Sequence, residues 1–214
     1  MKTWTFALGL LLALAGGAPV AAAAELPGDG WLGRLAENAP WGAIERLLAA
    51  YRRGIFPWYS GGQPPLWWSP DPRMVFATDG VRLSSRFRRG LRHSPWEVRA
   101  DTAFEQVITA CAKAPRPGQH GTWITSGMRQ AYIDLHRHGH AHSVEVFEGD
   151  ALVGGIYGVA IGRMFFGESM FSGRSGGSKV ALATLAARLH GWGWPLIDAQ
   201  VENDHLVSLG AVRM

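Results

Sequence analysis

The chain has 214 residues, of which 47% are hydrophobic and 18% are charged, and its formal net charge is +4. This length suits one large domain or two small ones, and the hydrophobic content supports a buried core and excludes an intrinsically disordered chain. The single cysteine, Cys111, excludes an intramolecular disulfide and a metal site made only of cysteines. The mild basic excess permits an anionic partner without requiring one.

Residues 1–24 have the pattern of a secretory signal peptide. Lys2 precedes a long apolar run from Trp4 to Ala15, and small residues lead up to Ala24. Two interpretations of this segment stay open, a signal peptide and a misassigned gene start.

The elements expected before residue 140 are mostly helical. Helical spacing and capping residues predict four helices, at Trp41–Arg53, Ser84–Arg92, Thr102–Lys113 and Thr125–His138. Two short apolar runs predict strands, at Met74–Ala77 and Trp96–Ala100. Residues 54–73 are rich in glycine, proline and aromatic side chains, which predicts a structured loop with short extended pieces. A second loop is expected at residues 114–121.

From residue 142 onward the pattern is dominated by strands. Three strand-like runs follow one another, at Ser143–Glu148, Ala151–Tyr157 and Val159–Met170. Turns are expected at Gly149-Asp150 and at Gly162. A helix and a final strand come next, at Ser178–His190 and Leu196–Val201. This order predicts an α+β fold, a two-layer mixed arrangement whose last strand returns to the sheet through a helical crossover.

Polar residues interrupt two of these apolar strands. Glu168 lies in the third run, and Asp198 and Gln200 occupy alternate positions of the final strand. Alternate strand residues point to the same face. A charge in an apolar strand is costly unless it is paired or used. The pattern therefore predicts a site shared by two strands that flank one helix.

Basic and aromatic residues suggest a second kind of surface. The stretch from Val81 to Arg99 contains six arginines, among them Arg86, Arg88 and Arg89. It suits either a solvated helix face or a surface that contacts phosphates. Four tryptophans in loop-like contexts suit either core packing or base stacking: Trp58, Trp67, Trp68 and Trp123.

Two further motifs give weaker signals. Four histidines alternate with other residues from His136 onward, but no second ligand cluster at zinc spacing follows, so we expect no metal site. The glycine-rich turn at Ser172–Leu182 is similar to the pyrophosphate-binding turn of acetyl-CoA-dependent acetyltransferases. Arg174 and Gly177 fit that pattern, whereas Lys179 does not.

Several uncommon sequence motifs follow one another along the chain. They include YRRGIFPWY at Tyr51, WWSPDPR at Trp67, TWIT at Thr122, FFGESMFS at Phe165, LIDAQ at Leu196 and HLVSLGA at His205. In these motifs and their order, the chain resembles the bacterial leucyl/phenylalanyl-tRNA–protein transferases, from about residue 29 to residue 211. The resemblance implies a small N-terminal domain at residues 25–78 and an acyl-CoA N-acyltransferase-like domain at residues 79–214.

The resemblance also implies an activity and the residues that bind the aminoacyl donor. Such an aminoacyltransferase of the N-end rule pathway moves Leu or Phe, with Met as a further candidate, from aminoacyl-tRNA to the α-amino group of proteins that begin with Arg or Lys. No cofactor is expected. The donor-binding residues fall into three groups: Trp58 and Trp123 for the terminal adenosine, Ile156, Phe165 and Met170 for the aminoacyl side chain, and Arg86, Arg88 and Arg89 for the tRNA backbone.

Three residues receive acceptor-side roles from the same resemblance. Glu168 would face the cationic acceptor terminus, and Asp198 with Gln200 would activate and orient the attacking amine. Because aminoacyl-tRNA is cytosolic, we expect a cytoplasmic location, with export as the alternative. We also expect a monomer that does not bind membranes.

The chain departs from the family pattern at its end, and two other functions stay open. The family continues beyond the SLGA motif, whereas this chain stops at Met214, so an apolar sheet edge is expected to lie unpaired. The alternative functions are an acetyl-CoA-dependent N-acetyltransferase and an inactive RNA-binding module.

Overall fold

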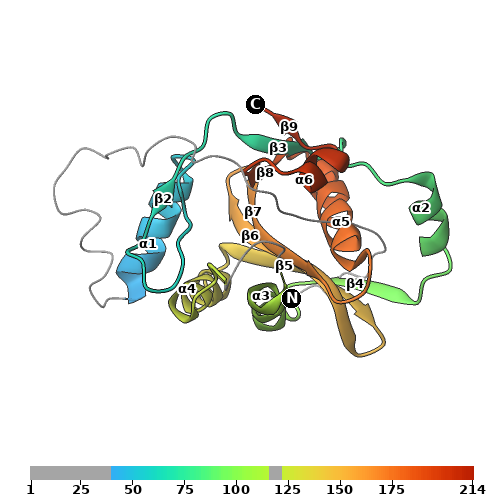
Figure 1. Cartoon of the computed structure of the whole chain (residues 1–214), viewed down its shortest axis with the longest axis horizontal. Helices are drawn as coiled ribbons and strands as arrows, with labels where there is room; N and C mark the ends of the chain where they lie inside the picture. Colours follow the sequence, from blue (N-terminus) through green and yellow to red (C-terminus); the bar gives the residue numbers. More distant parts are fainter. Residues whose placement is uncertain (1–39, 116–121) are drawn as a thin grey trace.

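The computed structural model describes residues 40–115 and 122–214. Within these residues, seven strands form one sheet in the order β4-β5-β6-β7-β8-β3-β9, and a separate pair forms a small ribbon (Figure 1). The strands are β1 Phe56–Pro57, β2 Trp67–Trp68, β3 Met74–Ala77, β4 Trp96–Ala100, β5 Ala141–Glu148, β6 Ala151–Ile161, β7 Met164–Ser172, β8 Leu196–Gln200 and β9 Val212–Arg213. The helices are α1 Pro40–Tyr51, α2 Ser85–Leu91, α3 Phe104–Lys113, α4 Ser126–Arg137, α5 Gly177–Gly191 and α6 Asp204–Ser208.

The centre of the sheet is an antiparallel meander that leads into a parallel crossover. β5, β6 and β7 are joined by turns at Gly149 and Gly162, whose φ angles of 59° and 60° favour glycine. β7 continues through α5 into β8, which pairs parallel with β7. The predicted meander, helix and returning strand are therefore confirmed.

One predicted boundary within the meander is wrong. The sequence suggests a break after Tyr157, whereas β6 continues through Gly158 to Ile161. The register with β7 shifts between Tyr157 and Gly158, so a bulge bends the strand without ending it. A Cβ at Gly158 would overlap the Phe166 carbonyl, so this glycine serves close packing instead of a turn.

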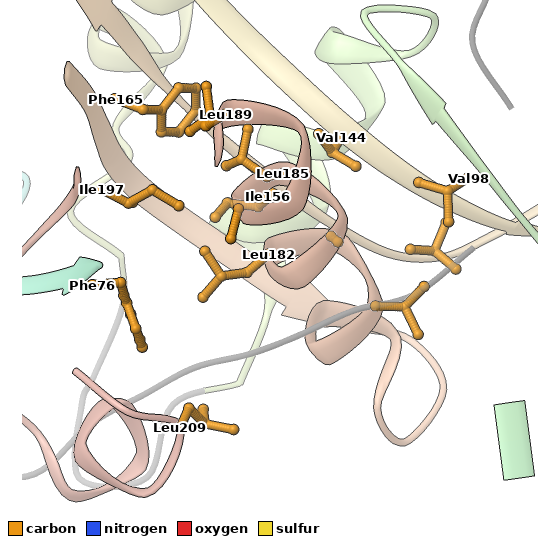
Figure 2. Packing of buried hydrophobic residues seen from close by; sticks show 14 of the residues in the cluster. Phe76, Val98, Val144, Ile156, Phe165, Leu182, Leu185, Leu189, Ile197 and Leu209 are labelled. Atoms are coloured by element: carbon orange, nitrogen blue, oxygen red, sulfur yellow. The ribbon is translucent and has the colours of Figure 1, made fainter. Parts of the chain in front are cut away.

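Two hydrophobic clusters, one on each face of the sheet, hold the layers together. On one face α5 packs on the strands, and Figure 2 shows Leu182 and Leu185 near Ile156 and Ile197. On the other face α1, α3 and α4 pack around a cluster that includes Tyr157. The α+β class is confirmed, but helices on both faces make three layers instead of two. The reason is that β6 buries side chains on both of its faces.

The N-terminal elements pack directly on the larger body. Tyr51, at the end of α1, and Phe56 of β1 belong to the same buried cluster as Tyr132 of α4. β3 then enters the large sheet between β8 and β9. The domain boundary at residue 78 stays a prediction, and β3, which precedes it, lies within the large sheet.

The third predicted run, Val159–Met170, begins before the turn at Gly162, whereas β7 begins after it, at Met164. The other predicted helices and strands agree with the structure to within two residues at each end. The predicted loop at residues 54–73 contains only the short strands β1 and β2. The signal-like segment, and the predicted loop from residue 116 to residue 121, lie outside the described residues. Among the described helices, none is both long enough and apolar enough to cross a membrane.

Candidate active site

A cavity of about 320 Å³ lies between β7, β8, the start of α5 and the segment around β1. Seven residues that the sequence singled out line this cavity: Trp58, Trp123, Ile156, Glu168, Met170, Asp198 and Gln200. The structure therefore brings together the polar strand residues, part of the predicted apolar pocket and the two tryptophans.

Asp198 is held by an arginine that directly precedes β3. Arg73 donates from Nε to Oδ1 at 2.9 Å and from Nη2 to Oδ2 at 2.7 Å. Its Nη1 donates to the carbonyl oxygen of Gly54 at 2.8 Å. A bidentate pair of this kind fixes the orientation of the carboxylate as well as its charge. Asp198, only 4% exposed, is thus a fixed negative charge in the cavity wall.

Gln200 ends β8 in a backbone conformation that is rare for residues other than glycine. Its φ is 62°, and such a conformation costs about 1–3 kcal/mol unless the surroundings hold it. Asp198 Oδ1 accepts a hydrogen bond from the Gln200 backbone amide at 2.8 Å and supports the conformation. Both side chains line the cavity, as strand alternation predicts.

Glu168 is surrounded by hydroxyl and amide donors. Gln200 Nε2 donates to Oε1 at 2.7 Å, and the Tyr132 hydroxyl donates to Oε2 at 2.7 Å. The Tyr51 hydroxyl also bonds with Tyr132. Either tyrosine can be the donor in the bond between them, and Tyr51 also hydrogen-bonds to Glu168.

The ionisation of Glu168 reflects this enclosure. Burial raises the pKa of Glu168 to about 7, and the negative charge of Asp198 acts in the same direction. The hydrogen bonds from Tyr51, Tyr132 and Gln200 lower the pKa and only partly offset the burial. Glu168 therefore exchanges its proton near neutral pH.

Trp58 and Trp123 reach the cavity from different elements. The Trp58 ring lies 5.7 Å from the Trp68 ring, and Trp68 Nε1 donates to the Trp58 carbonyl oxygen at 2.7 Å. The Trp123 ring meets Tyr132 edge-on, with 6.4 Å between the ring centroids. Both cavity tryptophans are half-buried, so part of each indole is open to a ligand.

The predicted apolar pocket is only partly reproduced by the cavity. Ile156 and Met170 are paired across β6 and β7, and both line the cavity. Phe165 is absent from the cavity lining. It packs in the core near Leu189 (Figure 2). Leu182 of α5 contributes to the cavity wall instead. The role of Phe165 in side-chain binding stays a prediction.

The predicted phosphate-contacting arginines lie away from the cavity. Arg86, Arg88 and Arg89 are on α2, are exposed, and do not line the cavity. Phe87 of the same helix lies 5.8 Å from the Lys179 ammonium, near the start of α5. α2 thus presents a basic surface to solvent at one end of the molecule (Figure 1).

The glycine-rich turn before α5 is closed by its own contacts. The Ser178 amide donates to Ser172 Oγ at 2.9 Å, and the Gly177 amide donates to the Arg174 carbonyl at 2.9 Å. A Cβ at Gly176 would overlap the Phe87 ring, so α2 covers this turn. Backbone donors that are already engaged do not favour pyrophosphate binding, so the turn adds nothing to the acetyl-CoA alternative.

Three of the alternating histidines, His136, His138 and His142, bond to nearby acceptors. His136 Nδ1 lies 2.8 Å from the Ala141 carbonyl oxygen, and His142 Nδ1 lies 2.8 Å from Asp101 Oδ2. Within the described residues, no group of three or more His, Cys, Asp or Glu side chains could hold a metal ion.

Sequence reasoning missed three side chains that organise the cavity. They do not line the cavity themselves, but they support the carboxylates that do. Arg73 bonds to Asp198. Tyr132 bonds to Glu168, and Tyr51 bonds to Tyr132. Arg73 lies in the motif WWSPDPR and Tyr51 in the motif YRRGIFPWY, but the residues they bond to are far away in the sequence. No local pattern connects Arg73 to a residue 125 positions away.

Comparison with known proteins places the chain in a family. A family model described as leucyl/phenylalanyl-tRNA protein transferase matches residues 75–214, and the model of that family's N-terminal domain matches residues 43–71. A relative described as leucyl/phenylalanyl-tRNA–protein transferase from Xanthomonas euvesicatoria is 74% identical over 196 residues, covering 92% of this chain and 77% of the relative.

Two further relatives carry the same description. One, from Xanthomonas oryzae, is 72% identical over 92% of this chain and 77% of its own length. Another, from Xylella fastidiosa, is 70% identical over 79% of this chain and 69% of its own length. The expected enzyme class, an aminoacyltransferase, is confirmed. The chain belongs to the leucyl/phenylalanyl-tRNA–protein transferase family.

Proposed function

We propose that this enzyme transfers Leu or Phe, with Met as a further substrate, from aminoacyl-tRNA to the α-amino group of proteins that begin with Arg or Lys. Such a transfer marks the acceptor for N-end rule degradation. The observation that carries the proposal is one cavity that joins an apolar wall, two accessible tryptophans and three polar strand residues.

The donor side of the cavity suits an aminoacyl group attached to a terminal adenosine. Ile156, Met170 and Leu182 form an apolar wall for the aminoacyl side chain. Such a wall separates side chains that differ by one methylene by only about 1–3 kcal/mol, so several apolar aminoacyl groups are accepted. Trp58 and Trp123 offer rings to the adenine, and stacking is worth roughly 1–3 kcal/mol per base.

The tRNA backbone would extend from the cavity to a basic surface. Arg86, Arg88 and Arg89 are exposed on α2 and can contact phosphates. These contacts would carry no sequence information, so they would supply salt-dependent affinity for any tRNA.

The acceptor side of the cavity suits a cationic amine. Glu168 and Asp198 place two carboxylates in the cavity wall. Gln200 bonds to both of them, through its backbone amide to Asp198 and through its side-chain amide to Glu168. The negative charge favours an acceptor that begins with Arg or Lys. The Gln200 amide, held by Glu168, orients the incoming α-amino group.

The reaction needs little activation because its donor is already an activated ester. The attacking nucleophile is a neutral amine, and an α-amino group has a pKa of about 7.7–8.0. A polar group that receives the amine proton therefore suffices, and no cofactor is proposed. Because aminoacyl-tRNA is a cytosolic donor, we propose that the enzyme acts in the cytoplasm. We also propose that it acts as a monomer.

The proposal is tested with labelled Leu-tRNA and a peptide that begins with Arg. We expect label to reach the peptide, and we expect Asp198→Ala to lower the rate at least about 10²-fold because the Arg73 charge and the Gln200 backbone lose their partner. A matched reaction with labelled acetyl-CoA tests the alternative donor. Label transferred from acetyl-CoA and not from Leu-tRNA, or tRNA binding without any transfer, would overturn the proposal.

A further inference from the structure

A second hollow, an open cleft, shares a wall with the cavity. The volume of the cleft is about 510 Å³, and its lining comes from α1, β6, β7, β8 and the segment after β2. Asp198 lines both the cavity and the cleft, whereas Phe56 lines only the cavity and Arg73 lines only the cleft. The Arg73 guanidinium lies 4.9 Å from the Phe56 ring. The Arg73–Asp198 pair therefore forms a partition between two adjacent binding spaces.

The floor of the cleft is apolar. Met164 and Phe166 occupy alternate positions of β7, so their side chains share a face of the sheet. Ile161 of β6 is paired with Met164 across the turn at Gly162. The Tyr51 ring lies 5.3 Å from the Phe166 ring and closes the floor on the α1 side. Ile161 and Met164 are only half-buried, so the cleft offers apolar surface to a ligand.

This floor begins beside the acceptor side of the cavity. Phe166 is the register partner of Asp198 across β7 and β8, and neighbouring strands lie about 4.8 Å apart. Met164 is two residues further along β7, which puts its Cα roughly 8 Å from that of Asp198. An extended polypeptide advances about 3.3–3.6 Å per residue. A chain whose first residue lies at Asp198 therefore reaches Phe166 with its second residue and Met164 with its third.

We propose that the cleft binds the second and third residues of the acceptor protein and favours apolar side chains at these two positions. This inference rests on the proposed function, because the cavity must hold the N-terminal residue of the acceptor. Apolar pockets discriminate weakly, so the preference is graded and acceptors with small side chains still react.

The cleft suits a polypeptide better than it suits the tRNA backbone. Two arginines are among the described residues that line it. Arg73 is already paired with Asp198 at 2.7 Å, and Arg52 is an exposed residue at the rim. Binding of a phosphate chain depends on several cations, and it gains nothing from the apolar floor.

The first test compares two peptides that differ only at their second and third positions. One begins Arg-Leu-Leu, the other begins Arg-Ala-Ala, and the polar sequence that follows is the same. With saturating Leu-tRNA, we expect kcat/KM of the wild type to be about 10-fold higher for Arg-Leu-Leu, mainly through a lower KM. Met164→Ala should reduce this ratio about threefold or more and leave the values for Arg-Ala-Ala unchanged, which general damage to the fold would not do.

The second test fills the cleft from its exposed side. Ser69 is exposed and lines the cleft, so Ser69→Trp can obstruct it without disturbing the core. We expect this variant to raise the KM of the Arg-Leu-Leu peptide about 10-fold. The KM of Leu-tRNA should not change, nor should the rate of transfer to arginine amide, which has no second residue. Ser60→Trp is the matched control, because Ser60 is exposed in the same segment and is not among the described residues that line the cleft.

Three results would overturn the inference. They are equal kcat/KM values of the wild type for the two peptides, an unchanged ratio in Met164→Ala, and a Ser69→Trp effect that Ser60→Trp reproduces or that appears in the KM of Leu-tRNA instead of the peptide. The last of these would assign the cleft to tRNA. Failure of the wild type to transfer Leu to arginine amide and to both peptides would instead overturn the proposed function.

Discussion

At the scale of single residues, the Arg73–Asp198 pair links the cavity to the stability of the fold. The side chains of Arg73 and Asp198 are 16% and 5% exposed. Arg73→Met keeps most of the side-chain volume and leaves the carboxylate buried without its cation. Breaking a buried pair in this way typically costs about 3–5 kcal/mol, so we expect a loss of about 3 kcal/mol in the free energy of unfolding. Urea denaturation followed by tryptophan fluorescence measures this change.

An exposed arginine provides the comparison for that variant. Arg137 pairs with Glu105 at 2.8 Å, but the two side chains are 57% and 59% exposed. Pairs of this kind contribute about 0–1 kcal/mol, so Arg137→Met should have little effect. Equal losses for the two variants would show that the Arg73 pair has no special structural role.

The residue scale also shows what the sequence could predict about the site. Glu168, Asp198 and Gln200 are recognisable because polar side chains in apolar strands are unusual. The hydrogen-bond partners of Glu168 are not recognisable, since Tyr51 and Tyr132 look like ordinary core aromatics on helices. Their hydroxyls meet the carboxylate only after three separate elements have packed together.

At the scale of elements, the closest approach of α5 to the sheet depends on two glycines. A Cβ at Gly154 of β6 would overlap the backbone of Gly177, the first residue of α5. Backbone cannot move aside as a flexible side chain can, so Gly154→Ala must displace the helix. Overpacking of this kind costs typically about 1–3 kcal/mol. Thermal unfolding should therefore show a lower melting temperature, and the cavity wall that α5 supplies should shift.

A helical glycine gives the opposite expectation. Gly127 lies in the first turn of α4, and a Cβ there would meet no atom within 4 Å. Gly127→Ala should leave the protein as stable or stabilise it by up to about 1 kcal/mol, because alanine favours helix. A melting temperature lowered as much by Gly127→Ala as by Gly154→Ala would contradict the role of close backbone contact.

Helices and strands were predictable where a short stretch of sequence determines them. β3 and β4 have the predicted bounds, since each is a short apolar run between turn residues. The position of β3 between β8 and β9 was not predictable, because that pairing joins residues more than 100 positions apart. The α1 packing site on α4 is likewise set by tertiary contacts and not by helical periodicity.

At the scale of the whole molecule, the cavity makes stability depend on pH. The pKa of Glu168 is about 7 in the folded protein and about 4.5 when the chain is unfolded. Between these values the folded state binds more protons than the unfolded state, so the free energy of unfolding falls as pH rises. The contribution of Glu168 is fully present below about pH 4.5 and is lost as pH rises through about 7. A shift of this size corresponds to roughly 3 kcal/mol.

This dependence is measured as a difference between two proteins, because other groups also titrate. The hydrogen bond to Asp101 raises the pKa of His142. The contribution of His142 to the free energy of unfolding therefore also falls as pH rises. Glu168→Gln keeps His142 and removes only the carboxyl group, so the difference between wild type and variant isolates Glu168. Wild type should lose stability relative to the variant by roughly 3 kcal/mol between about pH 4.5 and about pH 8, measured by urea denaturation. A difference that stays constant over this range would mean that Glu168 has an ordinary pKa, and that the enclosure by Tyr51, Tyr132 and Gln200 leaves it in contact with water.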